Sequence, residues 1–260
     1  MLPRDIAALL TPYLGAASLT DAQLSQISAY LDLLLRWNER INLTSIRDPE
    51  PIIQRHFGES LFTAAHLYQQ PETQNSDLGT HSRLAAWEPR LIDIGSGAGF
   101  PGLPIKIWAP SLRVTLIESQ QRKATFLREV IRTLDLRDID VSETRAEEFV
   151  PSTHNSELTT RSSGLGTEIS LETGNRQLEI TVTLRAVEHF HRVILAAVRI
   201  LLPTAQSPAS RAQSRLALLI GGSQLALARE LAPQLTWAEP ISVPHSTSRI
   251  LLIGNLAPCA

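Results

Sequence analysis

The chain has 260 residues, of which 43% are hydrophobic and 19% charged, and its formal net charge is −2. This composition is typical of a globular protein that can bury a sizeable core. It excludes a membrane span, which needs an apolar run of roughly 20 residues, and residues 1–10 lack the features of a secretory signal. The single cysteine, Cys259, cannot form an internal disulfide, so we expect a reducing, cytoplasmic location.

The N-terminal part of the chain has a helical pattern. Apolar residues recur at steps of three and four between Asp21 and Trp37, and Ser18, Thr20 and Asp21 are candidate caps for the start of this helix. Pro49 predicts a second helix start, because its missing N–H costs nothing at the first helical position. We therefore predict a helical extension over residues 1–66 and a polar linker without periodicity over 69–88.

From Arg90 onward, short apolar runs alternate with helical patterns. The predicted strands are 91–94, 114–117, 139–141, 178–184, 215–220 and 249–253, and the predicted helices are 103–109, 121–134, 187–202 and 223–232. This alternation predicts an α/β domain over 67–260, in which a parallel sheet is covered by helices on both faces. The polar stretch over 151–177 cannot bury enough surface to order itself, so we predict a flexible insertion.

The most specific local feature is a glycine-rich turn over residues 93–102. Gly95, Gly97 and Gly99 lie between a predicted strand and a predicted helix, where glycine allows a tight turn and a close approach by a ligand. Glu118 ends the next predicted strand, at the position where a carboxylate binds ribose hydroxyls in this architecture. Together these features predict a nucleotide cofactor.

The spacing of the glycines distinguishes between cofactors. In the dinucleotide fingerprint G-x-G-x-x-G the third glycine would fall on Phe100, which disfavours an NAD-dependent oxidoreductase. The turn instead has the form G-x-G-x-G, with Asp93 two residues before the first glycine. This form resembles the turn of S-adenosylmethionine-dependent methyltransferases, although a glycine turn without any ligand remains an alternative.

Several further segments resemble one family of such enzymes. They lie at residues 35–49, 55–61, 92–104, 116–119 with 122–123, 145–149 and 185–186. In these segments the chain resembles ribosomal RNA small subunit methyltransferase G, also called glucose-inhibited division protein B. The resemblance implies a Rossmann-like, mostly parallel methyltransferase sheet with an antiparallel late strand. It also implies N7 methylation of the guanine at position 527 of 16S rRNA, with S-adenosylmethionine as the methyl donor.

The resemblance and the glycine turn together give the candidate site. The family's cofactor positions fall on Gly95, Phe100, Ala146, Glu147 and Arg185, and the turn adds Gly97, Gly99 and Glu118. Guanine N7 carries a lone pair and no proton, so transfer by orientation alone needs no general base. Arg185 is therefore the one candidate for a catalytic role. No spaced partners accompany His56, so we expect no metal site.

The basic residues give candidates for contact with RNA. Only Lys106 and Lys123 among the 24 basic residues are lysine; the arginines suit bidentate contacts to phosphate and guanine, although a GC-rich genome would give the same bias. The candidates are Arg47, Arg55, His56, Lys106, Arg122 and Lys123. Arg55 could instead pair with Glu59, and Arg122 and Lys123 could be ordinary surface. The expected partner is 16S rRNA or the small ribosomal subunit, bound by a monomer.

The chain also departs from the family pattern. Glu59 replaces the usual aspartate, Ile220 stands where a lysine is common before the glycine that ends the fifth strand, and the stretch over 151–177 is unusually long. These departures leave open a small-molecule methyltransferase and a non-catalytic relative that binds RNA or cofactor. His189 and His191 are expected to be ordinary helix residues, whereas Trp37, Asn38 and Asn42 are expected to cap or pack a helix end.

Overall fold

A computed structural model gives the structure of the chain, and it describes residues 1–68, 87–151, 177–185, 189–202 and 214–256. The predicted linker over 69–88 and the predicted insertion over 151–177 lie almost entirely outside the described residues. Within the described ranges, none of the helices combines the length and the apolar character that a membrane crossing requires.

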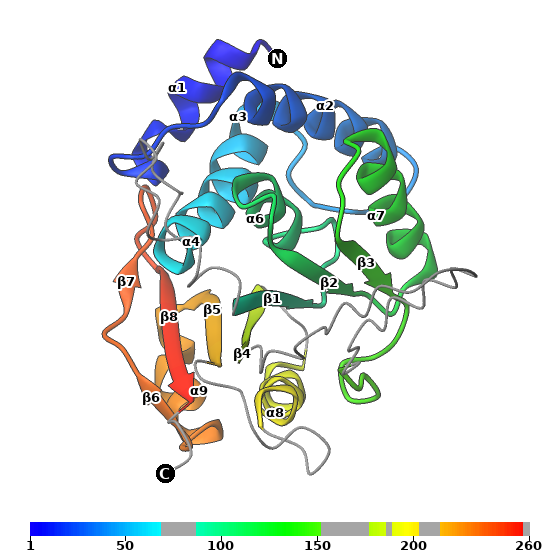
Figure 1. Cartoon of the computed structure of the whole chain (residues 1–260). Helices are drawn as coiled ribbons and strands as arrows, with labels where there is room; N and C mark the ends of the chain where they lie inside the picture. Colours follow the sequence, from blue (N-terminus) through cyan, green and yellow to red (C-terminus); the bar gives the residue numbers. More distant parts are fainter. Residues whose placement is uncertain (69–86, 152–176, 186–188, 203–213, 257–260) are drawn as a thin grey trace, which may run out of the picture.

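One twisted sheet forms the centre of the molecule (Figure 1). Its strands are β1 (Trp87–Ile94), β2 (Arg113–Ile117), β3 (Ile139–Ser142), β4 (Gln177–Arg185), β5 (Arg215–Gly221), β6 (Leu235–Trp237), β7 (Ile241–Ser242) and β8 (Arg249–Leu256). The order is β3-β2-β1-β4-β5-β8-β6, with β7 also paired to β8. The first five strands are parallel, and β8 is antiparallel to its neighbours. This confirms the predicted Rossmann-like methyltransferase sheet.

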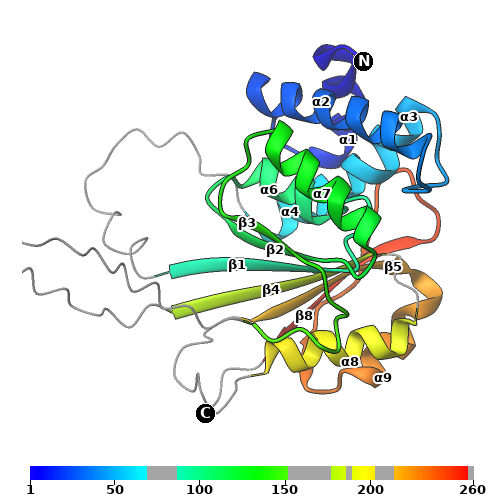
Figure 2. The same cartoon turned by 90° about the vertical axis from the view of Figure 1, so that its right-hand side faces the viewer.

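Helices cover both faces of this sheet (Figure 2). On one face lie α4 (Glu59–Leu67), α6 (Gly102–Trp108) and α7 (Gln121–Thr133), with α1 (Pro3–Leu14) and α2 (Asp21–Asn38) outside them. A short α3 (Pro49–Ile52) and a π-helical turn, η1 (Ile53–Gly58), lead into α4. On the other face lie α8 (Phe190–Leu201) and α9 (Leu225–Leu231), the latter preceded by a 3-10 turn, η2 (Gly222–Gln224).

The alternation of side chains along the strands buries apolar residues on both faces of the sheet. Leu91 in β1 shares a core with the N-terminal helices and also with α6 and α7. The next residue, Ile92, shares a core with α8 and α9. Successive residues of a strand point to opposite faces, so strands buried on both faces need continuous apolar runs. The apolar runs of the sequence therefore identified the main strands, whereas the short β6 and β7 were not predicted.

Two of the N-terminal helices, α2 and α3, begin at predicted residues. Thr20 and Gln23 form a reciprocal capping box at the start of α2, and Pro49 is the first residue of α3. Residues of α1 and α2 share one core with Leu91 and Phe126. The helical extension thus shares the core on this side of the sheet, and the boundary between 1–66 and 67–260 stays a prediction.

Candidate cofactor-binding site

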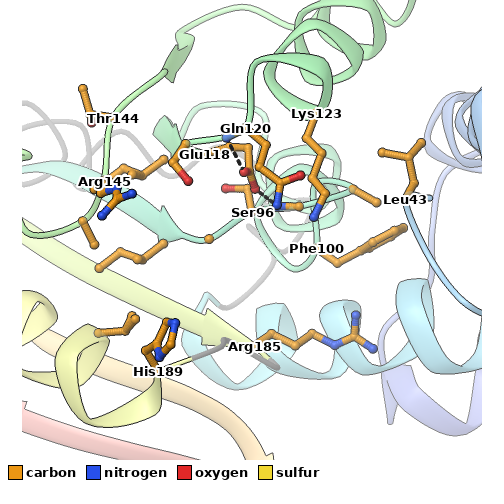
Figure 3. Close-up of a pocket in the computed structure, with 18 of the residues that line it drawn as sticks. Leu43, Ser96, Phe100, Glu118, Gln120, Lys123, Thr144, Arg145, Arg185 and His189 are labelled. Atoms are coloured by element: carbon orange, nitrogen blue, oxygen red, sulfur yellow. Dashed lines mark hydrogen bonds between the residues drawn. The ribbon is translucent and has the colours of Figure 1, made fainter. Parts of the chain in front are cut away.

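A pocket of about 450 Å³ opens at the carboxyl ends of β1, β2 and β4 (Figure 3). Ligands of open α/β sheets bind at this edge, and small-molecule sites have volumes of roughly 300–1,000 Å³. The lining side chains and backbone come from Leu43, Thr44, His56, Ile94 to Ala98, Phe100, Ile117 to Gln120, Lys123, Thr144 to Glu147, Arg185, His189, Arg192 and Val193. The pocket therefore brings together segments that are far apart in the sequence.

The glycine turn forms one wall of this pocket. Gly95, Gly97 and Gly99 all have positive φ angles, of 67°, 57° and 89°. A Cβ atom at Gly99 would collide with the Tyr30 hydroxyl of α2 and with the Leu103 side chain of α6. Glycine is needed here both for the backbone conformation and for the close approach of two helices.

Asp93, the last residue but one of β1, supports the turn from below. It is fully buried, and its carboxylate accepts hydrogen bonds from the Gly102 backbone N–H at 3.2 Å and from the Thr183 hydroxyl at 2.8 Å. Burial raises the pKa of Asp93 to about 6, partly opposed by these hydrogen bonds. Asp93 is thus a structural acid that connects β1, the start of α6 and β4.

Glu118 lies directly against the glycine turn. Its Oε2 accepts from the Gly97 backbone N–H at 2.9 Å, and its Oε1 accepts from the Gln120 backbone N–H at 2.8 Å (Figure 3). The residue is only 5% exposed, yet it lines the pocket. Each carboxylate oxygen can accept a further hydrogen bond, so a sugar diol in the pocket would find acceptors here.

The segment that follows β3 also lines the pocket. Ala146 and Glu147 both line the pocket. Arg199 of α8 donates to the carbonyl groups of Ala146 at 3.1 Å and Phe149 at 2.9 Å, which holds this turn against the helix. These contacts explain how a segment without regular secondary structure keeps a defined place in the pocket wall.

Arg185, His56 and Phe100 form the opposite wall. The His56 ring stacks on Phe100, with 4.9 Å between centroids, and the Arg185 guanidinium carbon lies 5.9 Å from the centroid of the same phenyl ring. Arg185 Nη1 donates to His56 Nδ1 at 2.9 Å, and His56 Nε2 lies 2.7 Å from the Thr44 hydroxyl. Burial, reinforced by Arg185, lowers the pKa of His56 to about 3, so the imidazole is neutral at pH 7.

The loop after α2 is held beside the pocket by the buried side-chain amide of Asn38. The Asn38 side chain accepts from the backbone N–H groups of Leu43 and Thr44, and it donates to the Thr44 carbonyl. Arg47 donates to the Asn38 carbonyl at 2.8 Å, so it also stabilises this loop. Asn38 lies at the helix end as expected, but its amide binds the loop backbone and does not cap the helix, and it brings Leu43 and Thr44 to the pocket wall.

Some predicted residues do not line the pocket. Gly99 is buried behind the turn, and Arg47, Arg55 and Arg122 lie outside the pocket with exposed side chains. The prediction for Lys106 is wrong, because its side chain is only 1% exposed and donates to the carbonyl groups of Pro110 and Leu112. A buried ammonium of this kind cannot contact RNA.

The structure also adds residues that the sequence interpretation missed. Thr44, Arg145 and Arg192 line the pocket, and Tyr30 supports the turn from α2. The prediction that His189 is an ordinary helix residue is wrong: it precedes α8 in a left-handed conformation, with φ of 54°, and lines the pocket. Thr44 and Arg145 stood within the segments that carried the family resemblance, which was the available signal.

Two further features concern Ile220 and the possible metal ligands. Ile220 is 4% exposed, and its side chain packs in the core on the α8 side, so this position offers no polar group to a ligand. The described residues contain no group of three or more histidine, cysteine or acidic side chains that could hold a metal ion.

The sheet order, the glycine turn and the acid at the end of β2 define a Rossmann-like methyltransferase fold. The family model for rRNA small subunit methyltransferase G matches residues 23–175. The chain belongs to this family. A relative from Chloroflexus aggregans, named ribosomal RNA small subunit methyltransferase G, is 34% identical over 92% of this chain and 85% of its own length.

Two other similarities cover less of the chain. A relative of the same name from Roseiflexus sp. is 46% identical over 50% of this chain, which spans only about half of that relative (48%). Among solved structures, a SAM dependent methyltransferase from Aquifex aeolicus matches 65% of this chain and 82% of its own, with a TM-score of 0.42 and 15% identity. That similarity is too distant to support an argument about activity.

Proposed function

We propose that this protein transfers a methyl group from S-adenosylmethionine to N7 of a guanine in 16S rRNA, the guanine at position 527 that the family resemblance implies. The observation that carries the proposal is the contact between Glu118 and the Gly97 backbone at the edge of the pocket. In this architecture the glycine turn and the acid of the next strand together hold a nucleoside.

The residues of the pocket fit this cofactor. Glu118 would accept hydrogen bonds from the ribose hydroxyls, and Ala146 with Glu147 would lie beside the adenine. Gly95, Gly97 and Phe100 would contact the methionine part of the cofactor, which carries the sulfonium. Gly99 does not line the pocket and would instead fix the conformation of the turn. The pocket volume of about 450 Å³ accommodates a ligand of nucleoside size.

The charge around the pocket favours a polyanionic substrate over a small neutral one. Although the whole chain has a net charge of −2, four basic residues line the pocket beside only two acidic ones, namely Lys123, Arg145, Arg185 and Arg192 against Glu118 and Glu147. Affinity for nucleic acid depends on such local groups, because they replace counterions at the phosphates. This excess supports RNA rather than a small-molecule acceptor.

The chain's own residues have to orient the reactants and exclude water. When bound, the cofactor would supply a sulfonium methyl group that bonds to the lone pair of guanine N7 as its carbon–sulfur bond breaks, leaving a neutral thioether and a cationic guanine, with no proton released. Arg185 and the neutral His56 would fix the guanine side of the pocket. Orientation of this kind can supply roughly 7–11 kcal/mol.

The proposal is tested by methyl transfer from labelled S-adenosylmethionine. The wild-type chain is incubated with unmethylated 16S rRNA and, in parallel, with small ribosomal subunits, and the methylated position is mapped by chain cleavage at 7-methylguanosine. Label at guanine 527 in either substrate supports the proposal, and the better substrate identifies the partner. Label in neither one, with a chain that binds the cofactor, contradicts it. We also propose that the protein is a monomer, which light scattering of the same sample tests. A cytoplasmic location is proposed as well.

A further inference from the structure

Glu59, at the start of α4, holds two arginines with one carboxylate oxygen. Its Oε2 lies 3.1 Å from Arg185 Nη2 and 2.9 Å from Arg249 Nη2. Glu59 is 3% exposed, and the Arg185 side chain is 8% exposed, so the contact is largely out of reach of water. The alternative pairing of Glu59 with Arg55 is replaced by these two contacts, which connect α4 to the end of β4 and the start of β8.

Arg185 is fixed through three of its five N–H donors. Nη1 donates to His56 Nδ1, and Nη2 donates both to Glu59 and to the Arg55 carbonyl at 2.7 Å. The Nε–H group is buried and has no partner among the described residues. A buried donor without a partner is costly, and an acceptor on a bound ligand would offset that cost.

The charges explain why an acid is required at this position. Arg185 and Arg249 repel each other, and Glu59 is the carboxylate that both of them contact. Burial lowers the pKa of Arg185 to about 10, and Glu59 opposes that effect. Without Glu59, two guanidinium groups would face each other in a poorly hydrated site, and Arg185 would have to rotate away from His56 and Phe100.

We propose that Glu59 is the positioning residue for Arg185 in methyl transfer, an inference that rests on the proposed function. Glu59 does not line the pocket, so it acts through Arg185 rather than on a substrate. The result is a fixed Arg185 at the carboxyl edge of the sheet, stacked near Phe100 and ready to donate to a ligand.

Three variants separate positioning from simple charge loss. Glu59→Gln removes the negative charge and keeps the size of the side chain. Arg249→Gln removes the other partner of Glu59 and leaves Arg185 held. The double variant Glu59→Gln with Arg249→Gln removes one charge of each sign, so the cluster keeps its net charge of about +1 while Arg185 loses its carboxylate. The double variant serves if Glu59→Gln alone does not fold.

Two measurements are made on each variant. The first is the kcat of methyl transfer at saturating cofactor and RNA, together with the Kd of S-adenosylmethionine. The second is the ¹⁵N–¹H signal of the Arg185 Nε–H group, assigned by its loss in Arg185→Lys, with its rate of exchange with water. The second measurement does not depend on any activity of the protein.

We expect kcat to fall about 10- to 100-fold in Glu59→Gln and in the double variant, since small misplacements of reacting groups cost factors of this size. The cofactor Kd should change less than about threefold, and the Nε–H signal should exchange faster. Arg249→Gln should keep kcat within about twofold and retain the signal.

Unchanged kcat or an unchanged Nε–H signal in the two Glu59 variants overturns the inference. A wild-type chain without methyl transfer overturns the proposed function instead, and the signal still decides whether Glu59 fixes Arg185.

Discussion

The Tyr30 hydroxyl of α2 donates a hydrogen bond to the Ala98 carbonyl in the glycine turn, at a separation of 68 residues. The same ring stacks on Phe100, with 5.4 Å between centroids and an interplanar angle of 6°. Helix α2 thus supports the glycine turn on the side away from the pocket, while Phe100 lines the pocket. The helical extension is part of the site, because the turn rests on it.

Replacing Tyr30 with phenylalanine removes only the hydroxyl group. The Ala98 carbonyl would lose its buried donor, so we expect the free energy of unfolding to fall by about 1–3 kcal/mol. The turn would also be less fixed, and the Kd of S-adenosylmethionine should rise about three- to tenfold. Denaturant unfolding and calorimetry measure the two effects. Ser25→Ala, which removes an exposed hydroxyl from the same helix, is the control and should change neither value. An unchanged cofactor Kd in Tyr30→Phe would show that the turn does not depend on α2.

Glu118→Gln keeps the shape of the side chain and removes its charge. One oxygen acceptor becomes a donor, so the amide cannot accept from both Gly97 and Gln120 and also from a sugar diol. We expect the Kd of S-adenosylmethionine to rise at least about tenfold, which corresponds to ~1.4 kcal/mol. Calorimetry measures it, with Glu143→Gln as the control, because Glu143 pairs with Arg128 at the surface. Equal cofactor binding in the two variants would remove Glu118 from the sugar site.

The local features of the site could be predicted from the sequence. The glycine turn and Glu118 are each encoded by a few neighbouring residues. The alternation of strands and helices makes the ends of β1 and β2 adjacent at one edge of the sheet. The contact between Gly97 and Glu118 then follows from the topology, over only 21 residues.

The long-range contacts could not be predicted in this way. Arg185 meets Glu59 across 126 residues, and no local pattern pairs them. The interpretation of Lys106 failed for a related reason: periodicity suggests which face of a helix is apolar, but not that a lysine folds back onto the carbonyl groups that follow its own helix. Likewise, no periodicity in the sequence indicates the left-handed conformation of His189, the residue before α8.

The only two lysines of the chain have different environments and should give different phenotypes. Lys106→Met removes a buried ammonium that satisfies two carbonyl groups, and burial already lowers the pKa of Lys106. We expect the free energy of unfolding to fall by about 1–3 kcal/mol, with no change in the KM for RNA. Lys123→Met should leave stability within about 0.5 kcal/mol and raise the KM for RNA several-fold, more strongly at low salt. An increase in KM for Lys106→Met, or none for Lys123→Met, would contradict this assignment.

His56 should make stability depend on pH. Its pKa is lowered from 6.5 to about 3 by burial and by Arg185, so the folded state binds fewer protons at this residue than the unfolded state. The stability that neutral His56 contributes is therefore complete above pH 6.5 and is lost progressively as the pH falls toward 3. Asp93, with its pKa raised to about 6, acts in the opposite direction between pH 4 and 6, so the informative quantity is a difference between variants.

The free energy of unfolding of the wild type minus that of His56→Gln should shrink by more than ~1.4 kcal/mol between pH 7 and pH 4, because a tenfold change in proton affinity has that value. Denaturant unfolding across this range measures the difference. A constant difference would mean that His56 is protonated normally and does not accept from Arg185 Nη1.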